Sequence, residues 1–147
     1  MNFDQFVKAL PEGLVYAPIY AKGTRMVSGK PATGKNPLEA SYEQKFGPAD
    51  VALAVQRNSD LKAVGVFTGI RGNGIVILDV DRNLSKYLQA WGSSLDGAPI
   101  ITSTKANAAK YLFRVPEELW ADVKGHGLRK EDGGDYEILW GRQGVVF

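Results

Sequence analysis

The chain has 147 residues, 44% of them hydrophobic and 23% charged, which is the length and composition of one globular domain. It contains no cysteine, which excludes disulfides, thiolate zinc sites and cysteine nucleophiles, and no apolar run reaches the roughly 20 residues of a membrane helix. The N-terminus lacks the basic and apolar layout of a secretory signal, so we expect a cytoplasmic protein. Because the net charge is only +2, a surface for nucleic acid has to be local.

The first 60 residues predict three helices and one strand. Apolar residues at positions i, i+3, i+4 and i+7 indicate an amphipathic helix over residues 3–10. Residues 14–20 are typical of a strand, and Pro18 favours an edge position because proline has no N–H to donate. Residues 38–46 and 48–58 predict two short helices, the second with a proline in its first turn.

A basic loop, residues 21–37, separates the strand from the second helix. It contains four cationic and no acidic side chains. Two interpretations are open: a solvated surface loop, or a surface that contacts the phosphate backbone of nucleic acid. The cationic residues are Lys22, Arg25, Lys30 and Lys35.

The remaining residues, 61–147, predict a sheet with short helices. Residues 61–68 and 74–81 are expected to be strands that pair as a hairpin through a tight glycine turn. The patterns that follow predict a helix, two strands, a helix and two strands, over residues 84–91, 99–102, 110–115, 116–125, 136–140 and 145–147. Strands and helices in mixed order indicate a single α+β domain, with a central mixed or antiparallel sheet flanked by short helices. We expect residues 1–60 to form its N-terminal part and residues 61–147 its sheet.

Two aspartates end the most apolar of these strands. Asp79 and Asp81 are separated by one valine, so they point to the same face less than about 7 Å apart along the backbone. Val76, Leu78 and Val80 point to the opposite face, where we expect helices. Two ionised carboxylates repel unless a cation lies between them, and oxygen-rich clusters suit Mg²⁺ or Mn²⁺. The alternative is a strand that simply ends in a turn, where aspartate is common.

A third acid, Glu137, follows the same alternation on a later strand. If that strand lies beside the strand of Asp79, three carboxylates converge and could hold two divalent ions for phosphoryl transfer. The alternative is that Glu137 forms an ion pair with Lys110, Arg114 or Arg142.

Polar residues suited to a triphosphate lie between these acids. Ser103, Thr104 and Lys105 end one predicted strand with hydroxyls and a cation, which can bind phosphate oxygens. The same residues are also compatible with a strand that leaves the sheet. Arg71, in the glycine turn, and Arg142, after the strand of Glu137, are either further phosphate contacts or plain surface charges.

The order of three segments resembles a known family. "VGVFTGIRGNGIVILDVD", "APIITSTKANAAKYLFRVP" and "GGDYEILWGRQGVV", within residues 64–146, resemble the bifunctional primase–polymerase domain of the archaeo-eukaryotic primase superfamily, found in phage and plasmid replication proteins. The family's first motif is matched by Asp79 and Asp81, and its third by Glu137, with Asp135 as the second choice. The second motif usually carries a histidine, where this chain has Lys110; its only histidine, His126, lies elsewhere.

The resemblance implies a DNA primase and DNA polymerase with an RRM-like catalytic core. Family members continue beyond the equivalent of Phe147, so we expect this chain to lack a C-terminal part of the fold. The implied partners are nucleoside triphosphates, a single-stranded DNA template and a helicase domain or protein. The implied sites are a catalytic Mg²⁺ or Mn²⁺ site (Asp79, Asp81, Glu137), a nucleotide site (Ser103, Thr104, Lys105, Lys110, Arg142) and a DNA surface (Lys22, Arg25, Lys30, Lys35, Arg71).

Two other functions are compatible with the sequence. Because the histidine is missing, the chain could be a catalytically impaired or truncated relative that only binds nucleotide or DNA. A phosphatase of the haloacid dehalogenase type also has a strand that ends in Asp-x-Asp. That family requires parallel strands with long crossovers, for which the turn at residues 69–74 is too short.

Overall fold

The computed structural model describes residues 1–102, 105–123, 129–131 (backbone only) and 134–147. Its elements form an α+β fold, as predicted, and every pairing between described strands is antiparallel. The chain divides into two compact units. The first unit is Met1–Phe67 with Gln143–Phe147, and the second is Thr68–Arg142. None of the described helices is long and apolar enough to cross a bilayer.

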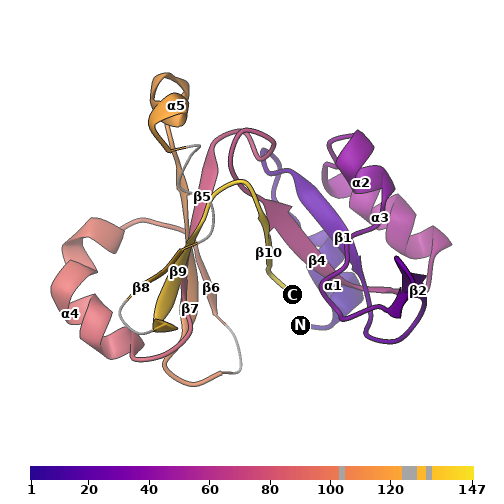
Figure 1. Ribbon diagram of the computed structural model, residues 1–147, viewed down its shortest axis with the longest axis horizontal. Helices are drawn as coiled ribbons and strands as arrows, with labels where there is room; N and C mark the ends of the chain where they lie inside the picture. The colour runs from indigo at the N-terminus through magenta and orange to yellow at the C-terminus, as the bar shows by residue number, and fades with distance from the viewer. Residues whose placement is uncertain (103–104, 124–128, 132–133) are drawn as a thin grey trace. The chain divides into compact units, whose positions relative to one another are not determined.

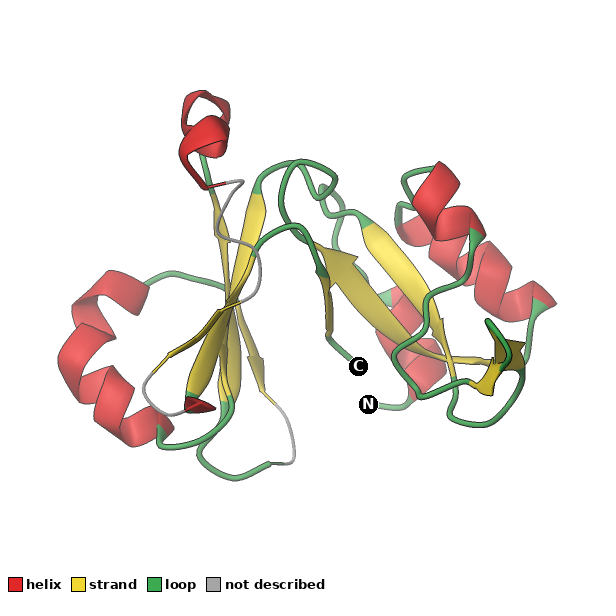
Figure 2. Cartoon of the chain, in the orientation of Figure 1, coloured by secondary structure: helices red, strands yellow, loops and turns green. Residues whose placement is uncertain are grey.

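The first unit contains a three-stranded sheet with helices beside it (Figure 2). Its strands are β1 (Tyr16–Tyr20), β4 (Leu61–Phe67) and β10 (Gln143–Val145), in the order β1-β4-β10. β1 is therefore at the edge, as its proline predicted. The helices are α1 (Phe3–Lys8), α2 (Ala40–Glu43) and α3 (Pro48–Arg57), which confirms the three predicted helices.

The basic loop of this unit contains a two-stranded hairpin that the sequence analysis did not identify. It pairs β2 (Met26–Val27) with β3 (Lys30–Pro31). Ser28 and Gly29 between them both have positive φ, of 50° and 78°, which is the requirement of a type I′ hairpin turn. Buried Ala32 then packs with Tyr20 and Leu61, so the loop returns to the core of the first unit.

The second unit is built on a five-stranded sheet in the order β6-β7-β5-β9-β8 (Figure 1). The central strand β5 (Ile75–Val80) lies between β7 (Ala109–Arg114) and β9 (Tyr136–Leu139), and β6 (Ile100–Thr102) and β8 (Arg129–Glu131) form the edges. Of these, only β8 was not predicted, because its charged sequence does not resemble a strand. Antiparallel partners on both sides of β5 argue against the parallel sheet of a haloacid dehalogenase.

One face of this sheet is covered by helix α4 (Leu84–Leu95) (Figure 1). Leu78 of β5 packs against the same buried cluster as Leu84 and Trp91 of the helix, as expected for the face opposite Asp79. The helix was predicted to end near residue 91, with a turn at 92–97, but it continues through Gly92. The reason is tertiary: Leu95 is buried against the sheet, and this contact outweighs the weak helix propensity of glycine. The predicted helix at 116–125 consists of two short parts, η1 (Glu117–Leu119) and α5 (Trp120–Val123).

The predicted hairpin between residues 61–68 and 74–81 is wrong. Both segments are strands, but β4 belongs to the three-stranded sheet and β5 to the five-stranded one. The turn between them closes on itself, because the N–H of Gly69 donates to Ile75 O at 2.8 Å and that of Gly74 donates to Gly69 O at 2.9 Å. These bonds satisfy the turn locally and leave each strand to pair with segments distant in sequence.

Candidate functional site

The centre of the candidate site is a row of charged residues across three neighbouring strands. In the antiparallel register, Asp79 of β5 stands directly opposite Lys110 of β7 on one side and Glu137 of β9 on the other. Residues directly opposite each other share a face of the sheet, with Cβ atoms about 4.5–5.5 Å apart. The expectation that the strand of Glu137 lies beside that of Asp79 is therefore confirmed.

Lys110 provides Asp79 with a cation from within the protein. Its ammonium nitrogen lies 2.8 Å from Asp79 Oδ1, and the two side chains are only 25% and 16% exposed. The distance is that of a charge-assisted hydrogen bond. An ion pair with Lys110 had been considered for Glu137, but the ion pair that Lys110 forms here is with Asp79.

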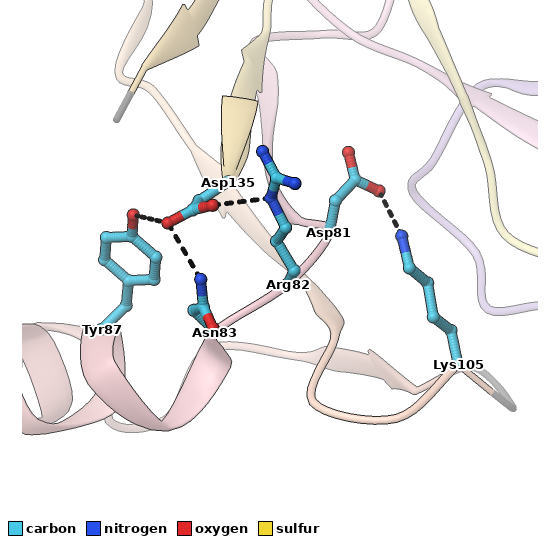
Figure 3. A network of polar contacts seen from close by, with 6 residues as sticks. All are labelled: Asp81, Arg82, Asn83, Tyr87, Lys105 and Asp135. Carbon is cyan, nitrogen blue, oxygen red and sulfur yellow. Dashed lines mark hydrogen bonds and ion pairs between the residues drawn. The ribbon is translucent and has the colours of Figure 1, made fainter. Parts of the chain in front are cut away.

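Asp81 lies one residue beyond the end of β5 and has a different environment. Its backbone N–H donates to Asp135 O at 2.8 Å, and its carboxylate lies 3.6 Å from the ammonium of Lys105 (Figure 3). Both side chains of this ion pair are well exposed, at 38% and 59%. Within the described part of the chain, no three His, Cys, Asp or Glu side chains lie close enough together to hold a metal ion. The structure thus brings Asp79 and Glu137 together, with Asp81 beyond them at the strand end.

Asp135, the second choice for the third motif, faces the helix. It is 7% exposed, and its carboxylate accepts hydrogen bonds from the Tyr87 hydroxyl at 2.8 Å, Arg82 Nε at 2.7 Å and the Asn83 amide at 3.3 Å (Figure 3). The Tyr87 hydroxyl is the main cause that lowers the pKa of Asp135, and Asn83 and Arg82 act in the same direction against burial. The sequence placed Asp135 on the same face as Glu137. That alternation fails because β9 begins only at residue 136.

This network around Asp135 was missed in the sequence. It connects the loop before β9 to the end of β5 and the start of α4, where Arg82 and Asn83 directly follow Asp81. The sequence did contain a signal for this network: Arg82 and Asn83, a cation and an amide suited to bind a carboxylate, lie between a predicted strand and a predicted helix. Lys130 of β8 was missed too; the register puts its backbone position opposite Glu137.

Of the other proposed phosphate contacts that the structure describes, Arg71 and Arg142 do not lie at this row. Ser103, Thr104 and His126 lie outside the described residues. Arg71 precedes β5 and Arg142 follows β9, so both are at the far ends of these strands from Asp79 and Glu137. The backbone of Arg142 exchanges hydrogen bonds with Thr68, and its side chain is exposed.

The basic loop in the first unit has one cation with a structural role. Arg25 donates to the Tyr20 hydroxyl at 2.8 Å, its guanidinium lies 4.6 Å from the ring centroid of Tyr20, and it forms an ion pair with Glu39 at 3.5 Å. Burial and the hydrogen bond to Glu39 raise the pKa of Tyr20 to about 12. The remaining cations, Lys22, Lys30 and Lys35, are exposed and compatible with either interpretation of the loop.

The geometry of this site is the basis for its functional interpretation. Asp79, Glu137 and Lys110 form the row, and Asp81 and Lys105 form an exposed pair at its end. Comparison of the chain with models of protein families, with curated proteins and with solved structures gave no significant match.

Proposed function

We propose that this chain is a primase–polymerase domain that carries out metal-dependent nucleotidyl transfer on a single-stranded DNA template. The observation that carries the proposal is the strand register. Asp79, Lys110 and Glu137 come from three separate sequence motifs, and they stand side by side on adjacent strands. Residues so far apart in sequence share a row only if the sheet order brings their strands together, which supports a common role.

The order of elements in the second unit supports the RRM-like core that belongs to this proposal. Along the chain the elements run β5, α4, β6, β7, the short helical segments η1 and α5, the strand β8 and then β9. Apart from the additional strand β8, this is a split β-α-β arrangement. In the sheet, β5 lies between β7 and β9, β6 is at one edge, and the additional strand β8 is at the other. α4 covers one face, and the row containing Asp79 lies on the other.

The two carboxylates of the row, Asp79 and Glu137, are the protein ligands that we propose for a divalent ion. Mg²⁺ binds through one or two carboxylates and completes its coordination with substrate phosphates and water, so Asp79 and Glu137 suffice as protein ligands, with Asp81 near the strand end. When bound, such an ion supplies Lewis-acid activation of the attacking 3′-hydroxyl and neutralises charge on the triphosphate. Lys105 and Lys110 add point charges for phosphate oxygens. Exposed lysines of the basic loop would contact the template, and a helicase would supply unwound DNA.

The direct test is primer extension with Mn²⁺ on a primed single-stranded template. A metal ligand contributes several kcal/mol of charge stabilisation, so Asp79→Asn and Glu137→Gln should each lower incorporation by about 100-fold or more. Asp96→Asn is a matched control, because Asp96 is an exposed carboxylate at the end of α4. Full activity of Asp79→Asn, with a folded protein, would refute the proposal.

A second candidate is a nucleotide- or DNA-binding module without catalysis. The ion pair between Lys110 and Asp79 favours it, because a lysine already neutralises the carboxylate and cannot perform the proton chemistry of the histidine it replaces. Such a module would bind DNA or nucleotide with strong salt dependence and extend no primer at any Mn²⁺ concentration.

A further inference from the structure

Asp79 forms an ion pair with a lysine of the protein in the absence of a metal ion. Lys110 Nζ contacts Asp79 Oδ1 at 2.8 Å, and the two residues are directly opposite each other on neighbouring strands. The ion pair is mostly shielded from water, so the attraction between its charges is only weakly screened by salt. A divalent ion that binds the Asp79 carboxylate must weaken this contact, because the ammonium and the ion repel each other at such short distances.

We propose that Lys110 is a resident counter-ion that a divalent ion displaces from Asp79, and that the displaced ammonium binds the triphosphate of the nucleotide. This inference rests on the proposed function, and it assigns Lys110 a regulatory role in that site. Lysine carries its charge on a flexible four-carbon stem with three donors. Its ammonium can therefore move from a carboxylate to a nearby phosphate while β7 keeps its register.

The exchange links the binding of metal and nucleotide. A free divalent ion gains Asp79 but leaves the Lys110 ammonium without its carboxylate. An ion that arrives with a triphosphate brings a new anion for that ammonium. The two ligands should then bind with positive coupling, and by linkage each strengthens the other by the same factor. A site built in this way discriminates against free metal and favours the metal–nucleotide complex.

Lys110→Met removes the charge and keeps most of the apolar stem, so it tests the exchange directly. With Mn²⁺ alone, measured through the electron paramagnetic resonance signal of the free ion, the variant should bind Mn²⁺ about tenfold or more tightly than the wild type. In buffer saturated with Mn²⁺, calorimetry should show weaker binding of dATP to the variant than to the wild type. Tighter metal binding combined with weaker nucleotide binding is a signature that a general loss of structure does not produce.

Four further variants of the full chain complete the experiment. Lys62→Met removes an exposed lysine of β4 and controls for net charge, and Lys110→Arg restores the charge; both should resemble the wild type. Asp79→Asn should lose the Mn²⁺ site. Lys110→Gln replaces Lys110→Met if circular dichroism shows that the latter is unfolded.

The outcomes separate the two levels of the proposal. If the Asp79-dependent Mn²⁺ site exists but loss of the Lys110 charge leaves its affinity unchanged or weaker, the counter-ion role is overturned and the proposed function stands. The same conclusion follows if Lys62→Met strengthens Mn²⁺ binding equally. If the wild type and the Lys110 variants show no Mn²⁺ site that Asp79→Asn removes, the metal-dependent function itself fails.

Discussion

The ion pair between Asp79 and Lys110 should contribute measurably to the stability of the second unit. At 2.8 Å and an effective dielectric constant near 20, two opposite unit charges attract by about 6 kcal/mol. Most of this attraction is offset by the loss of hydration, which reaches several kcal/mol per ion when burial is complete. Exposed ion pairs contribute about 0–1 kcal/mol, and breaking a buried pair costs about 3–5 kcal/mol. With side chains 25% and 16% exposed, we expect a coupling energy of about 1–2 kcal/mol.

A double-mutant cycle isolates this coupling from the other effects of each substitution. Lys110→Met, Asp79→Asn and the double variant would be unfolded with urea in EDTA at low ionic strength, and their free energies of unfolding compared. All three tryptophans, Trp91, Trp120 and Trp140, lie in Thr68–Arg142. Tryptophan fluorescence therefore reports the unfolding of the second unit separately from that of the first.

The result that would refute this reasoning is a coupling energy below about 0.3 kcal/mol, which is the usual deviation from additivity for independent sites. The pair would then behave as an exposed contact. A coupling that persists at high salt would support its shielding from water, because salt screens buried charges much less than exposed ones.

Three further predictions concern the rest of the fold. Hydrogen bonds, chiefly from the Tyr87 hydroxyl, lower the pKa of Asp135 below its ordinary value of 3.8. The ionised carboxylate therefore stabilises the folded protein at any pH above the pKa of the unfolded state. This stabilisation is lost as the pH falls through the lower pKa of the folded state. Asp135→Asn should be less stable at neutral pH and lose less stability on acidification, whereas parallel acid-unfolding curves would contradict this. Burial is the main cause that raises the pKa of Tyr16 and of Tyr20 to about 12, so stability should fall as the pH rises from 10 to 12. Absorbance titration of Tyr16→Phe and Tyr20→Phe should each show the loss of a tyrosine that ionises near pH 12. Gly69 has a positive φ, and Gly69→Ala would place a Cβ 2.6 Å from the backbone nitrogen of Gly141, so this variant should lose more than about 1 kcal/mol of folding stability. Gly92 lies within α4 with open space around its Cα, so Gly92→Ala should raise the folding stability by up to about 1 kcal/mol. Equal shifts of the two urea midpoints would contradict this contrast.

Most helices and strands could be predicted from the sequence because their signals are local. The apolar spacing at residues 3–10 predicted α1, and Pro48 marked the first turn of α3. The alternation around Asp79 correctly put Leu78 on the helix-covered face. Each of these properties depends on residues within one or two turns, or on a strand's own period of two, so the order of amino acids alone determines it.

The partners of those elements were decided only by the tertiary structure. The periodicity identified β4 and β5 as strands but did not reveal that they join different sheets, because pairing depends on segments far away in the sequence. The choice of Lys110 over the chain's other lysines as the cation at Asp79 follows from the register of β5 and β7. The side chain of Asp135 likewise faces α4 because β9 starts one residue later. The sequence by itself therefore determined which charged residues end the strands. The packing of distant strands decided which of these residues meet, because electrostatic attraction depends on the distance between charges in three dimensions.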